Sequence, residues 1–384
     1  MAFDSLSRLF PRRRGTSILV VRLDVVGDFF LWMRSGAVNL SQYARAHGGR
    51  AVLLANPLWA DYARASGLWD EVIELNDRRF CVSPLYRFRT LVRIRQLGAA
   101  QLIQTRASRV SLLEDCIARV CGIPERISPN GTLFNQAPWE RRLGNRNYER
   151  LIQIDERLDT HESCRNAQLA EALTGRAPVA FQFEPVKDWP RPVSIAVVLG
   201  AGDPGRAWPM EQLNSLVRHI CSAHPEFLIT VLGLPADSAS AAQLSMLTNE
   251  RVQNLVGKTS LAQFVSHIAA SRLVICNESA AYQVALAYDR DIVCFLGGGH
   301  YGHFAPLPRS AADAAVTFSR IIDLSVPMRC FGCNWHCIYP RAPREAYRCV
   351  AEVSLQSAIN AVDTLLAPTA EPASPVKDDR PWVS

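Results

Sequence analysis

The chain has 384 residues, of which 48% are hydrophobic and 20% charged, a composition typical of a globular protein with room for two ordinary domains. Its net charge of +6 is unevenly distributed: residues 1–180 hold 26 Arg, no Lys and 18 acidic residues, whereas the remainder balances to −2. This composition excludes a disordered chain, and no run approaches the ~18 consecutive apolar residues of a membrane-spanning helix.

The basic first half favours an anionic partner, such as a phosphorylated glycolipid, an anionic membrane surface or nucleic acid. Residues 1–16 form a basic segment with Arg12–Arg14, but they lack the order of charged and apolar regions found in a signal peptide. We expect this segment to be frayed, with a weak amphipathic turn at a bilayer surface as the alternative. Eleven cysteines without a secretory signal favour reduced thiols and a cytoplasmic location.

Strands and helices alternate over the first half of the chain, which predicts a parallel, doubly wound α/β sheet. A buried strand at 18–23 is followed by a break at Gly27 and a helix over 29–47. Further strands are predicted at 51–55, 71–75 and 102–105, and further helices at 58–66, 78–96, 108–121 and 162–173.

The second half repeats this alternation after a proline-rich stretch. Its predicted strands are 193–199, 227–232, 252–256, 273–276 and 292–296, and its predicted helices are 210–223, 261–270, 280–288 and 354–366. The resulting domain prediction is a first domain at 17–180, a linker at 181–192, a second domain at 193–349, a C-terminal helical segment at 350–366 and a disordered tail at 367–384.

Asp28 lies just beyond the first strand and at the start of a helix. Ligands of open α/β sheets bind at the carboxyl ends of strands, so this carboxylate can meet a substrate there. The alternative is a plain helix cap, which local sequence alone favours.

The turn Gly200–Pro209, GAGDPGRAWP, is a second candidate. Gly200, Ala201 and Gly202 allow the backbone to approach a ligand closely, and the forked guanidinium of Arg206 suits phosphate oxygens. The alternative is an ordinary glycine-rich loop with a solvated Arg.

Two further turns join a strand to a helix. In the first, Ser279 can donate to a phosphate while Glu278 accepts from sugar hydroxyls; the alternative is helix capping by Asn277 or Ser279. In the second, Lys258 and Thr259 can lie beside a nucleotide, with a simple Ser/Thr cap as the alternative.

Four cysteines follow the spacing Cys330-x2-Cys333-x3-Cys337-x11-Cys349. Four thiolates within twenty residues favour a structural site for zinc, iron or an iron–sulfur cluster, with His336 as a substitute ligand. Disulfides and unligated thiols are the alternatives.

A basic and aromatic stretch at 78–95 is a candidate acceptor-binding surface or a contact for the anionic inner face of a membrane. The arginines concerned are Arg78, Arg79, Arg87 and Arg89. A solvated helix face is an equal alternative, and nucleic acid is disfavoured because no recognised nucleic-acid-binding fold accompanies the charge.

Taken together, RLDVVGD, GAG-x3-R-x-WP, VGKTSL, CNESAAYQVALA and CFLGG resemble, in order and spacing, the motifs of glycosyltransferase family 9, the heptosyltransferase family, over residues 17–365. The resemblance implies a GT-B fold, in which two Rossmann-like domains face one another across a central cleft. The first domain would bind the acceptor and the second a nucleotide-diphospho-sugar, with ADP-heptose as the family's usual donor.

The same resemblance implies that Asp28 is the general base of an inverting, metal-independent transfer to a cell-surface glycan or lipopolysaccharide-type acceptor. The enzyme would be cytoplasmic, with peripheral contact to the inner membrane. The chain departs from the family pattern where Arg206 replaces Lys and where Glu278–Gln283, ESAAYQ, replaces Asp-(Ser/Thr)-Gly-Pro-x-His. The cysteine cluster is similar in type to those of iron-binding autotransporter heptosyltransferases. A protein heptosyltransferase and a non-catalytic sugar-nucleotide-binding protein are therefore the alternatives.

Overall fold

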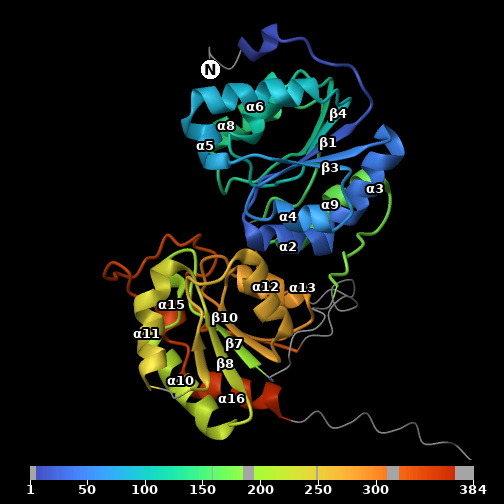
Figure 1. Cartoon of the computed structure of the whole chain (residues 1–384). Helices are drawn as coiled ribbons and strands as arrows, with labels where there is room; N and C mark the ends of the chain where they lie inside the picture. Colours follow the sequence, from blue (N-terminus) through green and yellow to red (C-terminus); the bar gives the residue numbers. More distant parts are fainter. Residues whose placement is uncertain (1–5, 158, 185–193, 248–249, 309–319, 368–384) are drawn as a thin grey trace, which may run out of the picture.

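The computed structural model describes residues 6–157, 159–184, 194–247, 250–308 and 320–367, and it comprises two α/β domains that face one another (Figure 1). Each domain is built on one parallel six-stranded sheet, in the order β3-β2-β1-β4-β5-β6 in the first and β12-β11-β10-β7-β8-β9 in the second. The predicted fold class, two doubly wound parallel sheets, is confirmed. None of the described helices is long and apolar enough to cross a membrane.

The elements of the first domain follow the 3₁₀ turn η1 (Leu6–Leu9). They are β1 (Ile18–Arg22), α2 (Val26–Ser35), α3 (Ala37–Gly48), β2 (Ala51–Ala55), α4 (Ala60–Ala65), β3 (Glu71–Glu74), α5 (Asp77–Val82), α6 (Pro84–Gln96), β4 (Gln101–Gln104), α7 (Glu114–Val120), β5 (Glu125–Pro129), α8 (Pro138–Asn145), β6 (Arg150–Ile152) and α9 (Glu162–Thr174).

The second domain follows the same scheme. Its elements are β7 (Ser194–Val198), η2 (Pro204–Arg206), α10 (Met210–Ala223), β8 (Leu228–Leu232), η3 (Pro235–Asp237), α11 (Ser238–Leu247), β9 (Val252–Asn254), α12 (Leu261–Ala270), β10 (Leu273–Asn277), α13 (Ala280–Ala287), β11 (Asp291–Phe295), β12 (Ile321–Leu324), α15 (Arg348–Ala351) and α16 (Leu355–Leu366).

The helix predicted over 29–47 is wrong as a single element, because the chain breaks between α2 and α3 at Gly36. A Cβ at Gly36 would lie 3.1 Å from the carbonyl oxygen of Asn166 on α9, so the break follows from close packing between distant segments. The helix predicted over 78–96 is likewise two helices, and the one predicted over 108–121 is shortened to α7.

The N-terminal segment is not frayed over its described part. Arg8 donates to the carbonyl oxygen of Arg119 (2.9 Å), and Arg12 donates to that of Ala99 (3.0 Å). Arg95 in turn donates to the carbonyl oxygen of Phe10 (3.2 Å). These hydrogen bonds hold the segment to the first domain. Leu9 on η1 is nevertheless 77% exposed, so the segment leaves apolar surface in water.

The two domains meet mainly through α2 and α13. Gly27 in the first turn of α2 is so close to α13 that a Cβ there would lie 3.2 Å from the Cα of Ala280. One cluster of buried side chains passes from the first sheet through both helices to the second sheet. The N-termini of these two helices therefore lie against each other, at the carboxyl edges of both sheets.

The beginning of the predicted linker also packs between the domains. Phe181 donates its backbone N–H to Met33 on α2 (2.9 Å), and the ring of Phe183 lies 5.1 Å from Phe30 and 5.4 Å from Tyr288 of the second domain. Residues 185–192 of the predicted linker, residue 193 of the predicted second domain and residues 368–384 of the predicted tail lie outside the described residues.

Candidate active site

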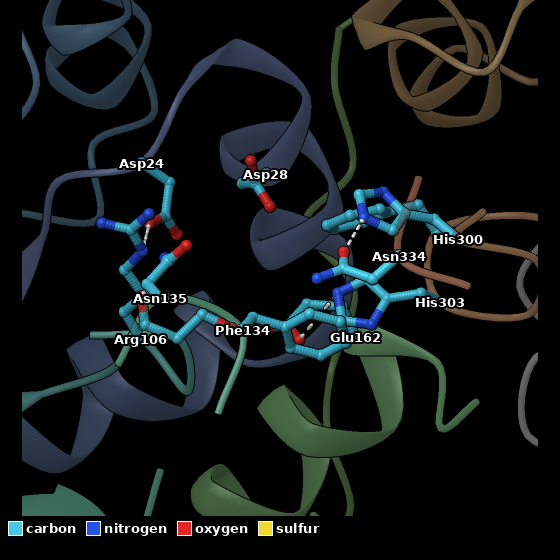
Figure 2. A pocket seen from close by; sticks show the side chains of 11 residues that line it. Asp24, Asp28, Arg106, Phe134, Asn135, Glu162, His300, His303 and Asn334 are labelled. Carbon is cyan, nitrogen blue, oxygen red and sulfur yellow. Dashed lines mark hydrogen bonds and ion pairs between the residues drawn. The ribbon is translucent and has the colours of Figure 1, made fainter. Parts of the chain in front are cut away.

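A pocket with a cavity volume of about 240 Å³ lies between the domains, at the carboxyl edges of the two sheets (Figure 2). The first domain contributes the loops that follow β1, β4 and β5 and the start of α9. The second domain contributes the loop after β11 and part of the segment 330–349, which carries the four clustered cysteines and is called the cysteine segment below. The lining residues are Asp24, Asp28, Arg106, Ser108, Phe134, Asn135, Glu162, His300, His303, Phe304 and Asn334.

Asp28 lies within the first turn of α2, and its carboxylate points into the pocket (Figure 2). The residue at the N-cap position is Val25, which makes no side-chain capping bond. The capping interpretation of Asp28 is therefore wrong: the carboxylate is placed by the helix start but does not close it.

Burial raises the pKa of Asp28 from its ordinary value of 3.8 to about 7, and the neighbouring carboxylate of Asp24 adds to the rise, whereas the guanidinium of Arg22 lowers it. Asp24 is itself paired with Arg22 (2.5 Å) and with Arg106 (2.6 Å). Asp28 thus lies beside a compensated cluster of charges, and none of the ion pairs found among the described residues includes its carboxylate. A carboxylate of this basicity can accept a proton from a reacting group near neutral pH.

The loop after β11 enters the pocket from the second domain and docks on α9. The backbone N–H of Glu162 donates to the carbonyl oxygen of His303 (2.8 Å), and Arg165 Nη1 lies 3.2 Å from His303 Nδ1. The ring of His161 contacts the carbonyl oxygen of Phe304 through Nε2 (3.0 Å). These contacts fix two imidazoles, His300 and His303, opposite Asp28.

In the loop after β7, Arg206 ends the short turn η2, where Asp203 caps the turn by accepting from the N–H of Gly205 (2.8 Å). The guanidinium lies over the ring of Trp335, with its carbon 4.6 Å from the ring centroid. Arg206 Nε is buried and has no hydrogen-bond partner among the described residues. Gly200 lies where a Cβ would approach the carboxylate of Asp237 to 2.9 Å, so this glycine is needed for close packing of two loops.

At the end of β10, Glu278 has two buried carboxylate oxygens that no described group bonds. Burial raises its pKa from 4.5 to about 7, Arg206 opposes the rise and the carboxylate of Asp323 adds to it. Ser279 occupies the N-cap position of α13 but makes no capping bond. Asn277 instead joins two loops, since its side chain accepts from the N–H of Trp208 (2.9 Å) and donates to Leu199 (2.9 Å). Capping by Asn277 or Ser279 is therefore wrong.

Around this edge of the second sheet, the buried polar atoms that have no partner among the described residues are of two chemical kinds. Hydrogen-bond donors without a partner are Arg206 Nε, Ser279 Oγ and Trp335 Nε1. Acceptors without a partner are both oxygens of Glu278, Gln283 Oε1 and His300 Nδ1. Buried polar groups in folded proteins are nearly always paired, so a ligand or ordered water is needed to complete the bonding of this set. The donors suit an anion, and the acceptors suit hydroxyl groups.

His300 belongs to both the pocket and this set. Its Nε2 lies 2.8 Å from Asn334 Oδ1, so Nε2 carries the hydrogen and Nδ1 is left as an acceptor (Figure 2). Burial lowers the pKa of His300, as does the nearby Arg206, whereas the Asn334 bond raises it. The lowered pKa favours the neutral imidazole, which can accept a hydrogen bond at Nδ1.

Lys258 and Thr259 do not line the pocket. Lys258 Nζ donates to the carbonyl oxygen of Asn254 (3.0 Å), and Ser260 caps α12 in a capping box with Gln263. The cap at this turn is confirmed for Ser260, and nucleotide contact by Lys258 and Thr259 stays a prediction.

The four arginines proposed for the acceptor lie on α5 and α6, on the side of the first domain that faces away from the second (Figure 1). Arg87 donates to the carbonyl oxygens of Phe80 and Cys81 (both 3.2 Å), and Arg79 lies over the ring of Tyr86 at 4.8 Å. The structure does not bring these residues, or Arg78 and Arg89, to the pocket. Their contact with an acceptor or a membrane stays a prediction.

The cluster's four cysteines form no disulfide, so the disulfide interpretation of the cluster is wrong. Cys349 Sγ accepts from the N–H of Gly298 (3.3 Å), which ties the cluster to the loop after β11. Within the described part of the chain, the group of His, Cys, Asp or Glu side chains whose ligand atoms converge closely is His219, His224 and Asp363. The four sulfur atoms of the cluster do not lie close enough together to form such a group. Metal binding by Cys330, Cys333, Cys337 and Cys349 stays a prediction.

Residues 136–324 match the model of glycosyltransferase family 9 (heptosyltransferase). This part of the chain therefore carries a domain of that family. The match covers the end of the first domain and most of the second, including Arg206, Glu278 and both pocket histidines. A search of curated protein sequences finds no match.

Solved structures show the same fold over nearly the whole chain. A family 9 glycosyl transferase from Veillonella parvula superimposes with a TM-score of 0.70 at 13% identity, covering 92% of this chain and 97% of that one. The ADP-heptose heptosyltransferase II of E. coli gives 0.65 at 17% identity, with coverages of 91% and 98%. TibC, an iron-containing dodecameric glycosyltransferase from enterotoxigenic E. coli, gives 0.52 at 11% identity, with coverages of 92% and 77%. The fold is GT-B, and the protein is a glycosyltransferase.

The sequence did not single out the pocket residues Glu162, His300, His303 and Asn334 for the site. A signal for two of them was present, since both histidines follow the run Gly297–Gly299 at the end of a predicted strand. Glu162 and Asn334 reach the pocket through contacts between the domains, which no local pattern reveals.

Proposed function

We propose that this enzyme catalyses an inverting, metal-independent transfer of a sugar from a nucleotide-diphospho-sugar to a hydroxyl of a cell-surface glycan, with Asp28 as the general base. The observation that carries the proposal is the position of Asp28, a carboxylate whose pKa is raised to about 7, at the contact between the N-termini of α2 and α13. Ser279 and Glu278, with their unpartnered polar atoms, directly precede α13.

In the proposed reaction the acceptor hydroxyl oxygen attacks the anomeric carbon and transfers its proton to the carboxylate of Asp28. The bond between the anomeric carbon and the diphosphate oxygen breaks as the new bond forms, and its electron pair leaves with the diphosphate. Arg206, the hydroxyl of Ser279 and the N-terminal amides of α13 would stabilise the negative charge that develops there. One displacement at the anomeric carbon inverts its configuration.

The first candidate donor is ADP-heptose. Two supports come from proteins of the same fold: one E. coli neighbour is named for ADP-heptose, and the E. coli heptosyltransferase WaaC is known with ADP and with an ADP-2-deoxy-2-fluoro heptose. Within this chain, the unpartnered acceptors Glu278 and His300 suit a ligand rich in hydroxyl groups. Glu278 is one methylene longer than the Asp of the family pattern, so the donor sugar needs a direct test.

The proposed acceptor is an anionic glycan or glycolipid of the lipopolysaccharide type, reached on the cytoplasmic side of the inner membrane. The excess of arginine over acidic residues in the first 180 positions supports an anionic acceptor. A protein acceptor is the alternative, and the neighbouring fold of TibC, together with the cysteine cluster, is the observation that favours it. Transfer assays that compare a lipopolysaccharide core acceptor with a protein acceptor separate the two.

The cysteine segment carries a separate proposal of a structural zinc or iron site. Four free thiols in one short segment are the donor set that either metal accepts, although their sulfur atoms do not converge closely in this structure. No catalytic step depends on such a site. Metal analysis of the purified protein, combined with its visible absorption spectrum, tests the proposal: a metal-free protein would remove it, and a colourless zinc protein would remove iron.

The donor is tested by a thermal-shift screen of the wild-type protein with ADP-, GDP-, UDP- and CMP-sugars. A ligand that binds the folded state at one hundred times its Kd stabilises that state by about 2.7 kcal/mol, which is readily detected. We expect ADP-heptose to give the largest increase in Tm and to be consumed when an acceptor is added. Stabilisation without turnover on any acceptor would instead favour the non-catalytic binding protein.

A further inference from the structure

The segment around the cysteine cluster places a tryptophan against the loop after β11. The ring of Trp335 lies directly on Gly297 and Gly299, since a Cβ at either glycine would come within 2.4 and 2.3 Å of ring atoms. The N–H of Asn334 donates to the carbonyl oxygen of Gly299 (3.0 Å). Two glycines without side chains thus form the recess that holds this indole.

The backbone at this point adopts a conformation that a bulky residue rarely takes. Asn334 has a φ of 48° and Trp335 a φ of 62°, both in the left-handed region. Two successive non-glycine residues persist there only when surrounding contacts hold them, and such strain gathers at functional sites. The contacts with the loop after β11 therefore stabilise this strained backbone and fix the position of the indole.

The held indole faces the anion-binding side of the proposed donor site. The Arg206 guanidinium lies over its ring, and the ring centroid of His300 is 5.7 Å away. Trp335 Nε1 is buried and unpartnered, as is Arg206 Nε. By contrast, Trp208 in the same domain donates its Nε1 to the carbonyl oxygen of Val353 (2.9 Å). Both unpartnered groups are N–H donors, which need an acceptor that the described protein does not supply.

We propose that Trp335 is a donor-site residue, whose indole N–H and neighbouring Arg206 together bind the diphosphate of the sugar nucleotide. The inference rests on the proposed function and assigns it a residue from the cysteine segment. It also gives that segment a role in the site: the cysteine-bearing chain supports the strained Asn334–Trp335 pair.

The test compares Trp335→Phe, which keeps an aromatic ring but removes the N–H, with wild type by isothermal titration calorimetry. ADP, GDP and UDP are titrated first, and the matching nucleoside of the tightest binder serves as the second ligand. A hydrogen bond to a charged group predicts a roughly tenfold increase in Kd for the diphosphate, with the Kd of the nucleoside within about twofold of wild type. Trp69→Phe is the matched control, because Trp69 is also buried with an unpartnered N–H but stacks on Trp32 in the first domain.

Four results decide the test. A diphosphate Kd unchanged in Trp335→Phe overturns the inference, and so does a parallel loss of nucleoside and diphosphate binding, which would indicate a packing role. If wild type binds none of the three diphosphates, the proposed function itself fails and takes this inference with it. Selective loss of diphosphate binding in Trp335→Phe, but not in Trp69→Phe, supports both.

An independent observation concerns the surface of the second domain where α10 and α16 pack together. His219 of α10, His224 at its C-terminal end and Asp363 of α16 bring three possible ligand atoms within 4.8 Å of one another. Both imidazoles present Nε2 to the same oxygen, Asp363 Oδ1, at 2.9 and 2.8 Å. All three side chains are partly open to water, with exposed fractions of 27%, 17% and 43%.

The geometry points to a divalent-cation site of the zinc type at this cluster, with water as the fourth ligand. Two imidazoles and a carboxylate are a common zinc ligand set, and bonds of about 2.0–2.1 Å in a tetrahedron separate the ligand atoms by about 3.3 Å. Widening the two contacts by about half an ångström would admit the ion. The bound ion would join the C-terminal helix α16 to α10, whereas without it the cluster is a pair of hydrogen bonds.

The site is tested on the full-length protein after removal of metal with a chelator. We expect Zn²⁺ to raise the Tm of wild type and to raise it less in His219→Gln/His224→Gln, with one fewer zinc ion bound per chain. His47→Gln, a surface histidine of the first domain, is the control. Cobalt distinguishes this site from the cysteines, because a histidine and carboxylate site lacks the intense thiolate charge-transfer band. Equal zinc content and equal Tm increase in the double variant and wild type overturn the proposal.

Discussion

Replacing Asp28 by Asn separates the proposed catalytic role of this carboxylate from its effect on stability. The folded-state pKa of Asp28 is about 7, above its ordinary value of 3.8. As pH rises, the unfolded chain therefore loses this proton first, and the folded state loses stability between about pH 4 and 7; above pH 7 the loss is constant. A gap of about three pH units corresponds to at most about 4 kcal/mol, and water in the open pocket reduces it to roughly 2 kcal/mol.

Asn has the shape of Asp but no titration, so Asp28→Asn is expected to unfold with a higher free energy than wild type at pH 8 and with a similar one at pH 4. Transfer activity should move in the opposite direction and fall on the order of 100-fold or more, because the acceptor hydroxyl loses its base. The wild-type rate should rise with pH through about 7, as the carboxylate ionises, and this rise should be absent from the residual rate of the variant.

Denaturant unfolding at the two pH values, together with a pH profile of transfer, measures both effects in one pair of proteins. Asp61→Asn is the control, since that side chain is 95% exposed and lies outside the pocket. Activity of Asp28→Asn near the wild-type level would refute the assignment of the base. A variant that is less stable than wild type at pH 8 would refute the electrostatic reasoning, even if activity fell.

Three further outcomes are expected. Arg206→Lys should raise the donor KM about tenfold with a smaller effect on kcat, measured by initial rates, because a lysine lacks the planar fork that lies over Trp335. Glu278→Gln should increase the free energy of unfolding above pH 7 but not below pH 4.5, because burial raises the pKa of this carboxyl to about 7; in donor titrations it should weaken binding of the sugar nucleotide more than of the nucleoside diphosphate. Arg165→Met should lower the free energy of unfolding in urea by about 3–5 kcal/mol, because it leaves the carboxylate of Glu162, 5% exposed, without its cation.

The fold could be predicted largely because the interior strands and amphipathic helices carry their own pattern. The predicted helices at 210–223 and 261–270 coincide with α10 and α12, whose apolar faces and end signals are local. Strands β5 and β12 were missed for a physical reason: β5 begins with Glu-Arg and ends with Pro, and β12 has four half-buried residues at a sheet edge. Neither shows the apolar run of a central strand.

The candidate site was predictable where one loop suffices and not where two loops must meet. Asp28, Arg206 and Glu278 each follow a strand end, so parallel-sheet geometry alone directs attention to them. Asn334 and Glu162 become pocket residues because the domains close on each other, as the contacts between α9 and the loop after β11 show. The arginines on α5 and α6 illustrate the converse, since charge composition marked a surface that the fold places elsewhere.

Two departures from the family pattern have a physical explanation in a neighbouring group: Arg206 contacts Trp335, and Gln283 contacts the loop that carries His300. Arg in place of Lys at position 206 matches the indole of Trp335, because a planar guanidinium lies flat on a ring whereas a compact ammonium does not. Gln283, in place of the family's His, donates to the carbonyl oxygen of Phe304 (2.9 Å) and so helps to hold the loop that carries His300 into the pocket. The family's imidazole on α13 is therefore absent here, and another imidazole, that of His300, enters the site from the loop after β11. A donor site reorganised in this way retains a cation and an imidazole, which argues for continued transfer chemistry rather than for a scaffold that has lost its activity.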